Sequence, residues 1–241
     1  MVVRDGVRLH YLDSCGTAAV PPVVFVPGMG DDADDYRDLL DELLPRRVLA
    51  VDLRGRGRSD APESGWSLAH HVDDLDAVVG AAGLDQLHLA SYSRGTAYAL
   101  GWATTHPGRV LSVTIGDYGA RQVLVPAEHR EGFRFRRWRG RPMNERMDPR
   151  AIDAIFAAGE AVEFWDELGA LGIPVLLLRG TEPGALVTDE VVARYRESVP
   201  GIEVVPVPGS GHDLWRPDPH VFPRTLASFL DRVDGADPAR A

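Results

Sequence analysis

The amino-acid sequence predicts an α/β fold, with a mostly parallel, doubly wound sheet of about eight strands, helices on both faces and a small helical cap insertion. Three observations support this prediction. Short continuous apolar runs, which indicate strands covered on both faces, alternate with longer segments of helical spacing. Turns rich in glycine and proline separate the two kinds of segment. The alternation breaks off once, over residues 121–170, and then resumes, as it does around an inserted segment.

The individual elements follow in chain order. Two short strands around the turn Asp5-Gly6 are expected first, at 2–4 and 7–13. A buried strand at 22–26 ends in glycines, and a helix follows at 36–44, where apolar residues recur with helical spacing. The same alternation predicts the remaining strands at 47–51, 86–90, 110–115, 173–178 and 202–207, and the remaining helices at 68–82, 96–105, 189–198 and 219–232.

The chain of 241 residues is long enough for one well-buried core and contains no linker-like segment. We therefore expect residues 1–120 and 171–241 to form a single α/β core, and residues 121–170 to form the cap. In open parallel sheets, active residues gather beyond the carboxyl ends of the strands. The cap is expected to cover that edge.

Composition excludes several classes of protein. Hydrophobic residues make up 44% and charged residues 26% of the chain, which are ordinary values for a globular protein. The single cysteine, Cys15, allows neither an intrachain disulfide nor a thiolate metal site. No apolar run is long enough to span a bilayer, and the N-terminus lacks the apolar core of a signal peptide. We therefore expect a cytoplasmic protein with no membrane partner.

The charge of the chain is unevenly distributed. The net charge is −10, and every cationic side chain other than histidine is an arginine, which hints at a GC-rich bacterial genome. Residues 121–150 hold nine arginines against four acidic side chains, a balance of +5, so the remainder carries −15. A body this acidic argues against nucleic acid as a partner.

The most informative motif is Ser91-Tyr-Ser-Arg-Gly95, where an apolar, strand-like run passes directly into a helix-like run. A serine on so sharp a strand-to-helix turn exposes its hydroxyl at the rim of the sheet, and small residues two before and two after it relieve the crowding. Ser91 stands where a glycine is usual in this pattern. Ser93 is therefore the candidate nucleophile.

A serine hydroxyl needs a base within hydrogen-bond reach. The segment Pro208-Gly-Ser-Gly-His212 follows the last predicted strand and delivers a histidine to the same rim of the sheet. The other histidines lack this context, and no pair of them shows metal-ligand spacing. We expect His212 to be the general base and no metal to take part.

Four segments in this order resemble the α/β-hydrolase fold superfamily over nearly the whole chain: P-G-M-G at 27–30, D-L-R-G-R-G-R-S at 52–59, S-Y-S-R-G at 91–95 and P-G-S-G-H at 208–212. The segment at 52–59 is more often structural than catalytic in that family. The family often has His-Gly where this chain has Pro27-Gly28, so the hydrogen bonds that support the loop must come from elsewhere.

The resemblance implies a serine hydrolase with a small cap and no cofactor. In it Ser93 is the nucleophile and His212 is the general base, and later the acid toward the leaving group. The resemblance also implies an oxyanion hole made by the backbone N–H groups of Met29 and Arg94. Epoxide hydrolases and haloalkane dehalogenases of similar fold use an aspartate nucleophile, so Ser93 argues against both activities.

The carboxylate that should hold the tautomer of the histidine has three candidates. Similar hydrolases usually carry it after the strand at 173–178, where Glu182 stands one residue too early. Some members of the superfamily take it from the end of the earlier strand at 110–115, and that position is Asp117 here. Asp189 is the third candidate, although it suits the first turn of a helix. Asp117 is preferred, with Glu182 as the alternative acid.

The cap segment 132–141 interleaves three aromatic residues with arginines. This pattern suits stacking on, or pairing with, an anionic and partly apolar molecule. It equally suits an exposed helix whose arginines balance the acidic residues at 31–35. The expected partner is a small-molecule substrate, anionic or aromatic. The residues expected to line its pocket are Gly28, Tyr92, Tyr118, Phe133, Trp138 and Trp165.

The leading functional hypothesis is hydrolysis of a small ester, lactone or thioester through an acyl-enzyme on Ser93. One alternative uses the same site for hydrolysis of a carbon–carbon bond, or for a cyclase or lyase step of a biosynthetic pathway. An alternative from another class is a ligand-binding protein whose turnover is incidental. No sequence feature indicates an oligomeric state.

Overall fold

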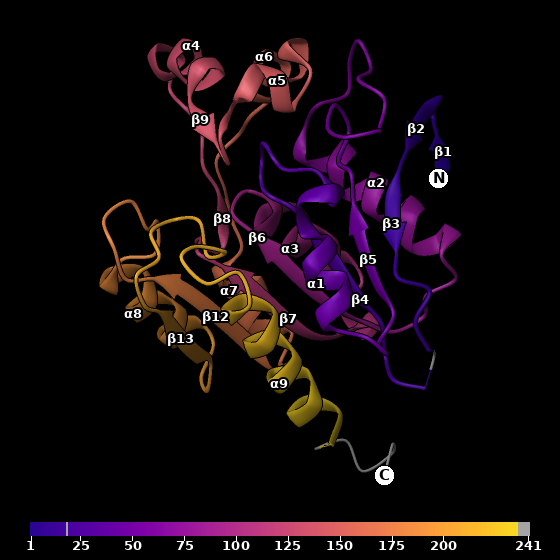
Figure 1. Cartoon of the computed structure of the whole chain (residues 1–241), viewed down its shortest axis with the longest axis vertical. Coiled ribbons are helices and arrows are strands. Elements are labelled where there is room, and N and C mark those ends of the chain that lie inside the picture. The colour runs from indigo at the N-terminus through magenta and orange to yellow at the C-terminus, as the bar shows by residue number, and fades with distance from the viewer. Residues whose placement is uncertain (18, 236–241) are drawn as a thin grey trace.

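The computed structural model describes residues 1–17 and 19–235, so the last residues of the predicted core, 236–241, lie outside the described residues. Its central sheet has seven strands in the order β13-β12-β7-β6-β4-β5-β3 (Figure 1). All neighbouring strands run parallel except β3, which pairs antiparallel with β5 at the edge. In chain order these strands are β3 Tyr11–Asp13, β4 Val23–Val26, β5 Val48–Val51, β6 Leu87–Tyr92, β7 Val110–Gly116, β12 Val175–Gly180 and β13 Glu203–Val207.

The expected strand at 7–13 is divided at His10. Strands β1 (Val2–Arg4) and β2 (Val7–Leu9) form their own antiparallel sheet, and β3 begins after His10 in the central sheet. The backbone N–H of His10 donates to Ser59 Oγ (2.8 Å), and its ring Nδ1 contacts Asp52 Oδ2 (2.7 Å). His10 makes these contacts at the point where the expected strand is divided into β2 and β3.

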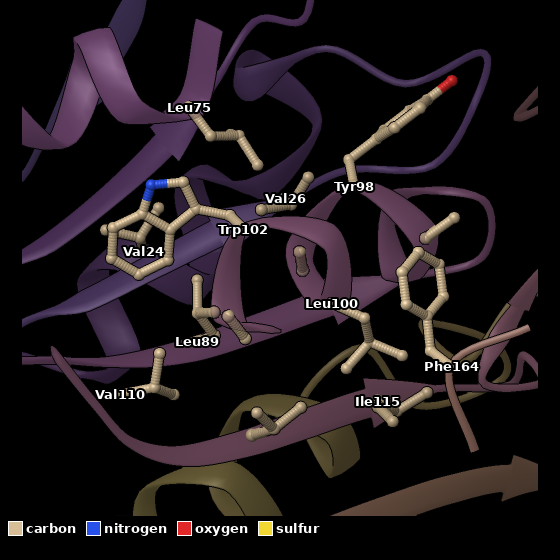
Figure 2. Close-up of a cluster of buried hydrophobic side chains, with 14 of the residues drawn as sticks. Val24, Val26, Leu75, Leu89, Tyr98, Leu100, Trp102, Val110, Ile115 and Phe164 are labelled. Atoms are coloured by element: carbon tan, nitrogen blue, oxygen red, sulfur yellow. The ribbon is translucent and has the colours of Figure 1, made fainter. Parts of the chain in front are cut away.

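Helices cover both faces of the central sheet, which confirms the doubly wound fold. Val24 and Val26 of β4 face one layer of helices, and Val23 and Phe25 face the other, as the period of two in a strand requires. The first layer, part of which Figure 2 shows, consists of α2 Leu68–Ala81, α3 Gly95–Thr105, α7 Trp165–Ala170 and α8 Asp189–Ser198. The second layer consists of α1 Arg37–Glu42, preceded by the 3-10 turn Ala33–Tyr36, and α9 Val221–Gly235.

The segment between β7 and β12 rises above the carboxyl edge of the sheet (Figure 1). Strands β8 (Arg121–Gln122) and β11 (Val162–Glu163) pair antiparallel and form its neck. Beyond the neck lie α4 Ala127–Phe135, the hairpin of β9 Arg137–Trp138 and β10 Arg141–Pro142, α5 Met143–Arg146 and α6 Pro149–Ala157. Helix α7, inside the range expected for the cap, packs with α3 and α8 against the sheet instead.

None of the described helices is long and apolar enough to cross a membrane.

Helix α3 begins in close contact with the end of β4. A Cβ atom on Gly95 would lie 2.2 Å from the carbonyl oxygen of Pro27 and 2.4 Å from that of Val26. These atoms belong to the backbone and cannot move aside cheaply. The position therefore requires glycine, and the close approach fixes the turn that carries Ser93 against the neighbouring loop at 27–30.

We predict that Gly95→Ala lowers the free energy of unfolding by more than about 2 kcal/mol, because the added methyl overpacks against backbone. Gly80→Ala, on the exposed face of the last turn of α2 with open space around the position, is the matched control. It should raise the free energy of unfolding by about 0.5–1 kcal/mol, since alanine favours the helix. Urea denaturation measures both, and equal effects at the two positions would contradict the close-contact argument.

Candidate active site

Ser93 lies on the sharp turn between β6 and α3 that the sequence predicts. Its φ of 51° is in the left-handed region, which a non-glycine residue adopts only when the surrounding structure holds it there. Its backbone N–H donates to the carbonyl of Gly116 (2.9 Å). Ser91, in place of the usual glycine, is fully buried, and its hydroxyl bonds Thr114 O (3.2 Å) and contacts Thr96 Oγ1 (3.1 Å). A small polar residue is thus accommodated at this position.

The strand register brings the candidate residues to one edge. Tyr92 of β6 is paired with Gly116 of β7, and Gly116 is paired with Leu178 of β12. Ser93 follows Tyr92, and Asp117 follows Gly116. These two residues therefore leave the sheet side by side at its carboxyl edge.

His212 joins these two residues by a pair of hydrogen bonds. Its Nε2 lies 2.9 Å from Ser93 Oγ, and its Nδ1 lies 2.8 Å from Asp117 Oδ2. An ionised carboxylate only accepts, so Nδ1 carries the proton and Nε2 is free to accept the proton of the serine hydroxyl. The ring of His212 also stacks on Tyr92 (centroids 5.1 Å apart), whose hydroxyl donates to the carbonyl of His212 (2.5 Å).

The carboxylate of Asp117 is fully buried, and its oxygens are satisfied by backbone as well as by His212. Oδ2 accepts from the N–H of Leu186 (2.8 Å), and Oδ1 accepts from the N–H groups of Gly180 and Val187 (both 3.3 Å). Hydrogen bonds of this kind satisfy the polar atoms of a buried carboxylate.

The two other candidate acids do not contact His212. Glu182 is exposed, and the one hydrogen bond of its carboxylate among the described residues comes from the hydroxyl of the adjacent Thr181 (3.4 Å). Asp189 lies in the first turn of α8, as its sequence position suggests, and pairs with Arg179 (2.6 Å).

The loop at 27–33, which carries Met29, is supported by arginines from distant segments. Arg56 Nε donates to the carbonyl of Met29 (3.0 Å), and Arg146 Nε donates to that of Gly30 (2.7 Å). Asp52 accepts from the backbone N–H groups of Ala33 (2.6 Å) and Arg58 (3.0 Å). The segment at 52–59 therefore has a structural role here, and it supplies supporting bonds that Pro27-Gly28 cannot.

Beneath this loop, Arg56, His71, Tyr98 and Arg94 form a buried cluster. Burial lowers the pKa of His71 well below its usual value, and the adjacent Arg56 lowers it further, so the imidazole is neutral. Its Nε2 then accepts from Arg56 (3.1 Å), while Nδ1 donates to the carbonyl of Ser67 (2.9 Å). Burial opposes ionisation of Tyr98, but the guanidinium groups of Arg94 and Arg56 outweigh it and lower the pKa of that phenol.

A cavity of about 550 Å³ opens over Ser93 and His212. Four residues expected in the pocket line it: Tyr92, Tyr118, Phe133 and Trp138. Met29 and Arg94, the residues expected to supply the oxyanion hole, line it as well. Within the described residues there is no group of three or more His, Cys, Asp or Glu side chains placed to hold a metal ion.

Two of the expected pocket residues do not line the cavity. Gly28 lies beneath it, where an added Cβ would meet Ser93 Cβ at 3.2 Å and Asp31 Oδ2 at 2.6 Å. Trp165 is buried in the main core, with its ring against Tyr195 (centroids 4.8 Å apart). The sequence alone does not show whether an aromatic residue in this segment packs in the core or lines a pocket.

Several residues that line the cavity had not been expected from the sequence. They are Gly30, Asp31, Gly119, Arg121, Val123, Val125, His129, Met143 and Leu186. Gly132 and Arg136, which also line it, belong to the segment 132–141 that was expected to contact an anionic molecule, and Phe156 was expected under the cap, as packing or as pocket wall. One signal could have revealed part of this set: His129, Gly132, Phe133 and Arg136 follow the spacing i, i+3, i+4, i+7 of a single helix face. The others come from loops, whose course the sequence does not fix.

Arg139 connects the cap to both loops of the site. It lies in the two-residue turn between β9 and β10, where Arg139 and Gly140 have φ of 46° and 82°, as a type I′ turn requires. Its guanidinium lies over the rings of Tyr36 (4.9 Å) and Trp215 (5.2 Å) and pairs with Asp213 (3.5 Å) and Asp31 (3.8 Å). Asp213 follows His212 directly, so the cap hairpin is anchored beside the catalytic loop.

Comparison with known proteins shows similarity over nearly the whole chain. Residues 21–139 match the family model described as alpha/beta hydrolase fold. A protein of Bacillus subtilis (strain 168), provisionally named 2-succinyl-6-hydroxy-2,4-cyclohexadiene-1-carboxylate synthase, is 25% identical over 97% of this chain and 98% of its own length. The 2-(acetamidomethylene)succinate hydrolase of Mesorhizobium japonicum is 24% identical over 88% of each chain.

A solved structure also has this fold. The crystal structure of the enol-lactonase from Burkholderia xenovorans LB400 superimposes with a TM-score of 0.78, covering 94% of this chain and 98% of the lactonase, at 20% identity. At that level of identity the likeness concerns the fold.

We predict that Asp117→Asn lowers kcat by about 10⁴-fold, because an amide NH₂ opposite Nδ1 forces the histidine into the tautomer that cannot accept from Ser93. Glu182→Gln should change kcat less than about twofold, since its side chain is exposed and away from the imidazole. Steady-state kinetics on an ester that the wild type turns over measures both. The reverse ranking of the two variants would reassign the acid.

We also predict that Arg139→Met lowers the free energy of unfolding by about 3 kcal/mol, because it removes the cation that faces Asp31 and Asp213. Arg137→Met, on the same hairpin but exposed, should lie within about 0.5 kcal/mol of the wild type. Urea denaturation followed by tryptophan fluorescence measures the difference. Equal stability of the two variants would show that the contact contributes nothing.

Proposed function

Since the chain belongs to the α/β-hydrolase fold superfamily, we propose that it is a serine hydrolase that cleaves a small ester, lactone or thioester. Its relatives include hydrolases and a synthase, which supports an activity of hydrolase or lyase type. The observation that carries the finer proposal is the pair of hydrogen bonds from Ser93 through His212 to Asp117, at the floor of a cavity.

In the proposed reaction, Ser93 Oγ attacks the substrate carbonyl carbon while His212 Nε2 takes the hydroxyl proton. Asp117 stabilises the imidazolium that forms. The negative charge on the carbonyl oxygen is stabilised by the backbone N–H groups of Met29 and Arg94. His212 then returns the proton to the leaving group, and the acyl-enzyme remains on Ser93. A water molecule, deprotonated by His212, attacks the acyl carbon, and His212 returns that proton to Ser93 Oγ as the acid is released.

A second candidate is a lyase or carbon–carbon bond hydrolase on the same side chains. It is favoured by the likeness to the Bacillus subtilis protein named as a synthase, which extends over nearly the full length of both chains. In an elimination, His212 and Ser93 would move a proton without an acyl intermediate. Formation of an acyl-enzyme therefore separates the lyase from the ester hydrolase, whereas a carbon–carbon bond hydrolase that uses Ser93 as the nucleophile is distinguished by its substrate.

We predict that a fluorophosphonate probe labels the wild-type protein, because Ser93 is activated by the adjacent imidazole. Labelling should disappear in Ser93→Ala and persist in Ser228→Ala, a control on the exposed face of α9. Hydrolysis of short-chain aryl esters, lactones and thioesters should fall by at least about 10³-fold in Ser93→Ala. Intact-protein mass spectrometry with a slowly hydrolysed ester should show an acyl adduct on Ser93.

The competing interpretations give other results. A lyase would be labelled by the probe but would show no acyl adduct with its own substrate. A ligand-binding protein would label slowly or not at all. Absence of labelling in the folded wild type would refute the serine nucleophile.

A further inference from the structure

Three arginines line the cavity above Ser93, namely Arg94, Arg121 and Arg136. In the part of the chain that the structure describes, none of the three forms a salt bridge with a carboxylate. The one acidic side chain in the lining, Asp31, is already engaged: it accepts from Trp138 Nε1 (2.5 Å) and faces Arg139 and Arg146. The cavity wall therefore carries an excess of positive charge, in a chain whose net charge is −10.

Arg94 is the most buried of the three, with 5% of its surface exposed. Its hydrogen bonds go to a phenol and a backbone carbonyl: Nε donates to Tyr98 Oη (3.2 Å), and Nη1 donates to the carbonyl of Val123 (3.2 Å). The phenol of Tyr98 is shared between two guanidinium groups, those of Arg94 and Arg56. A buried guanidinium without a carboxylate partner is costly, and an anion in the cavity would offset that cost.

Arg121 is placed toward the cavity by β8, where alternate side chains face opposite sides. Arg121 and Val123 line the cavity, while Gln122 between them is buried on the other side and donates to the carbonyl of Glu160 (2.9 Å). The guanidinium of Arg121 folds over Gly119, where its Nε lies 3.3 Å from the position of an added Cβ.

Arg136 follows α4, which presents one face to the cavity. His129, Gly132 and Phe133 lie on that face one and two turns before it, and open space surrounds Gly132. The arginine on another face of α4, Arg134, pairs with Asp153. Arg130, also on α4, donates to the carbonyl of Val125 (3.4 Å), and neither it nor Arg134 lines the cavity.

We propose that this wall is a carboxylate-binding subsite, and that the substrate is a small ester, lactone or thioester that carries a free carboxylate at a distance from the scissile carbonyl. This inference rests on the proposed function. Arg121 and Arg136 bind the carboxylate by charge-assisted hydrogen bonds, and Arg94 supplies a fixed positive field beneath it. The apolar side chains of Phe133, Phe156 and Met143 contact the carbon chain between the two groups.

The interpretation that these arginines only balance the acidic body accounts for others in the cap. Arg146 pairs with Asp35 and Asp31, and Arg150 pairs with Asp148. The arginines of the cavity have no such partners, although acidic side chains are abundant elsewhere in the chain. Arg130, Arg137 and Arg141 of the cap also lack carboxylate partners among the described residues, but they lie outside the cavity. Charge balance therefore leaves unexplained why three arginines gather on one cavity wall over Ser93.

The test compares two esters of nearly equal length, mono-4-nitrophenyl glutarate, which carries a carboxylate, and 4-nitrophenyl pentanoate, which does not. The wild type should prefer the glutarate ester in kcat/KM by more than about tenfold, and the preference should shrink as the salt concentration rises. Arg121→Gln and Arg136→Gln should each reduce the preference about tenfold. The control is Arg141→Gln, which removes the same charge from an exposed arginine outside the cavity and should keep the preference.

A binding measurement separates this inference from the proposed function. Calorimetry with glutarate and the Ser93→Ala variant should detect binding, and adding Arg121→Gln and Arg136→Gln to that variant should abolish it. Glutarate binding without turnover of either ester would keep the subsite and refute the hydrolase. Turnover of both esters at equal rates, with no glutarate binding, would refute the subsite and keep the hydrolase.

Discussion

The candidate site depends on one buried carboxylate. Asp117 has no contact with solvent, and a buried charge is tolerated only when it is fully hydrogen-bonded. Its partners come from the end of β12 (Gly180), from the loop before α8 (Leu186 and Val187) and from the loop after β13 (His212). The demand of this charge for hydrogen bonds therefore holds three separate segments at the positions the reaction needs. The histidine is oriented as one member of that set, which is why its ring faces Ser93.

The arginines of the chain serve the site in two distinct ways. One set is structural: Arg56 and Arg146 bind carbonyls of the loop that carries Met29, and Arg139 anchors the cap hairpin beside Asp213. These side chains replace the support that the loop lacks because it begins with Pro27-Gly28. The other set, on the cavity wall, has no carboxylate partners within the described chain. The same residue type thus stabilises the loops of the site and leaves positive charge facing the cavity.

Much of this arrangement could be predicted from the sequence, because it depends on local patterns. The turn at Ser93 needs a small residue on each side, and the alternation of apolar strands and helices specifies the parallel sheet; both are present in the structure. The acid could not be assigned from spacing, because the loops after β7 and β12 both reach the same edge and only three-dimensional contact distinguishes Asp117 from Glu182. Trp165 was wrongly expected in the pocket, since a short aromatic segment looks the same whether it covers a core or a cavity. The break at His10 was also missed, because it arises from hydrogen bonds to Ser59 and Asp52, far away in sequence.

The position of the acid has a further consequence for how the cap and the catalytic residues are related. Because Asp117 lies at the end of β7, the chain passes directly from it through Tyr118 and Gly119 to Arg121, and all three of these residues line the cavity. An acid after β12 would have left the start of the cap free to vary without disturbing the histidine. Here the neck strand β8 begins four residues after the carboxylate, and Tyr195 Oη donates to the carbonyl of Tyr118 (2.8 Å), which ties this short connection to α8. The proposed catalytic acid and the start of the cavity wall therefore lie on one short connection, which is held at Asp117 by its hydrogen bonds and at Tyr118 by Tyr195.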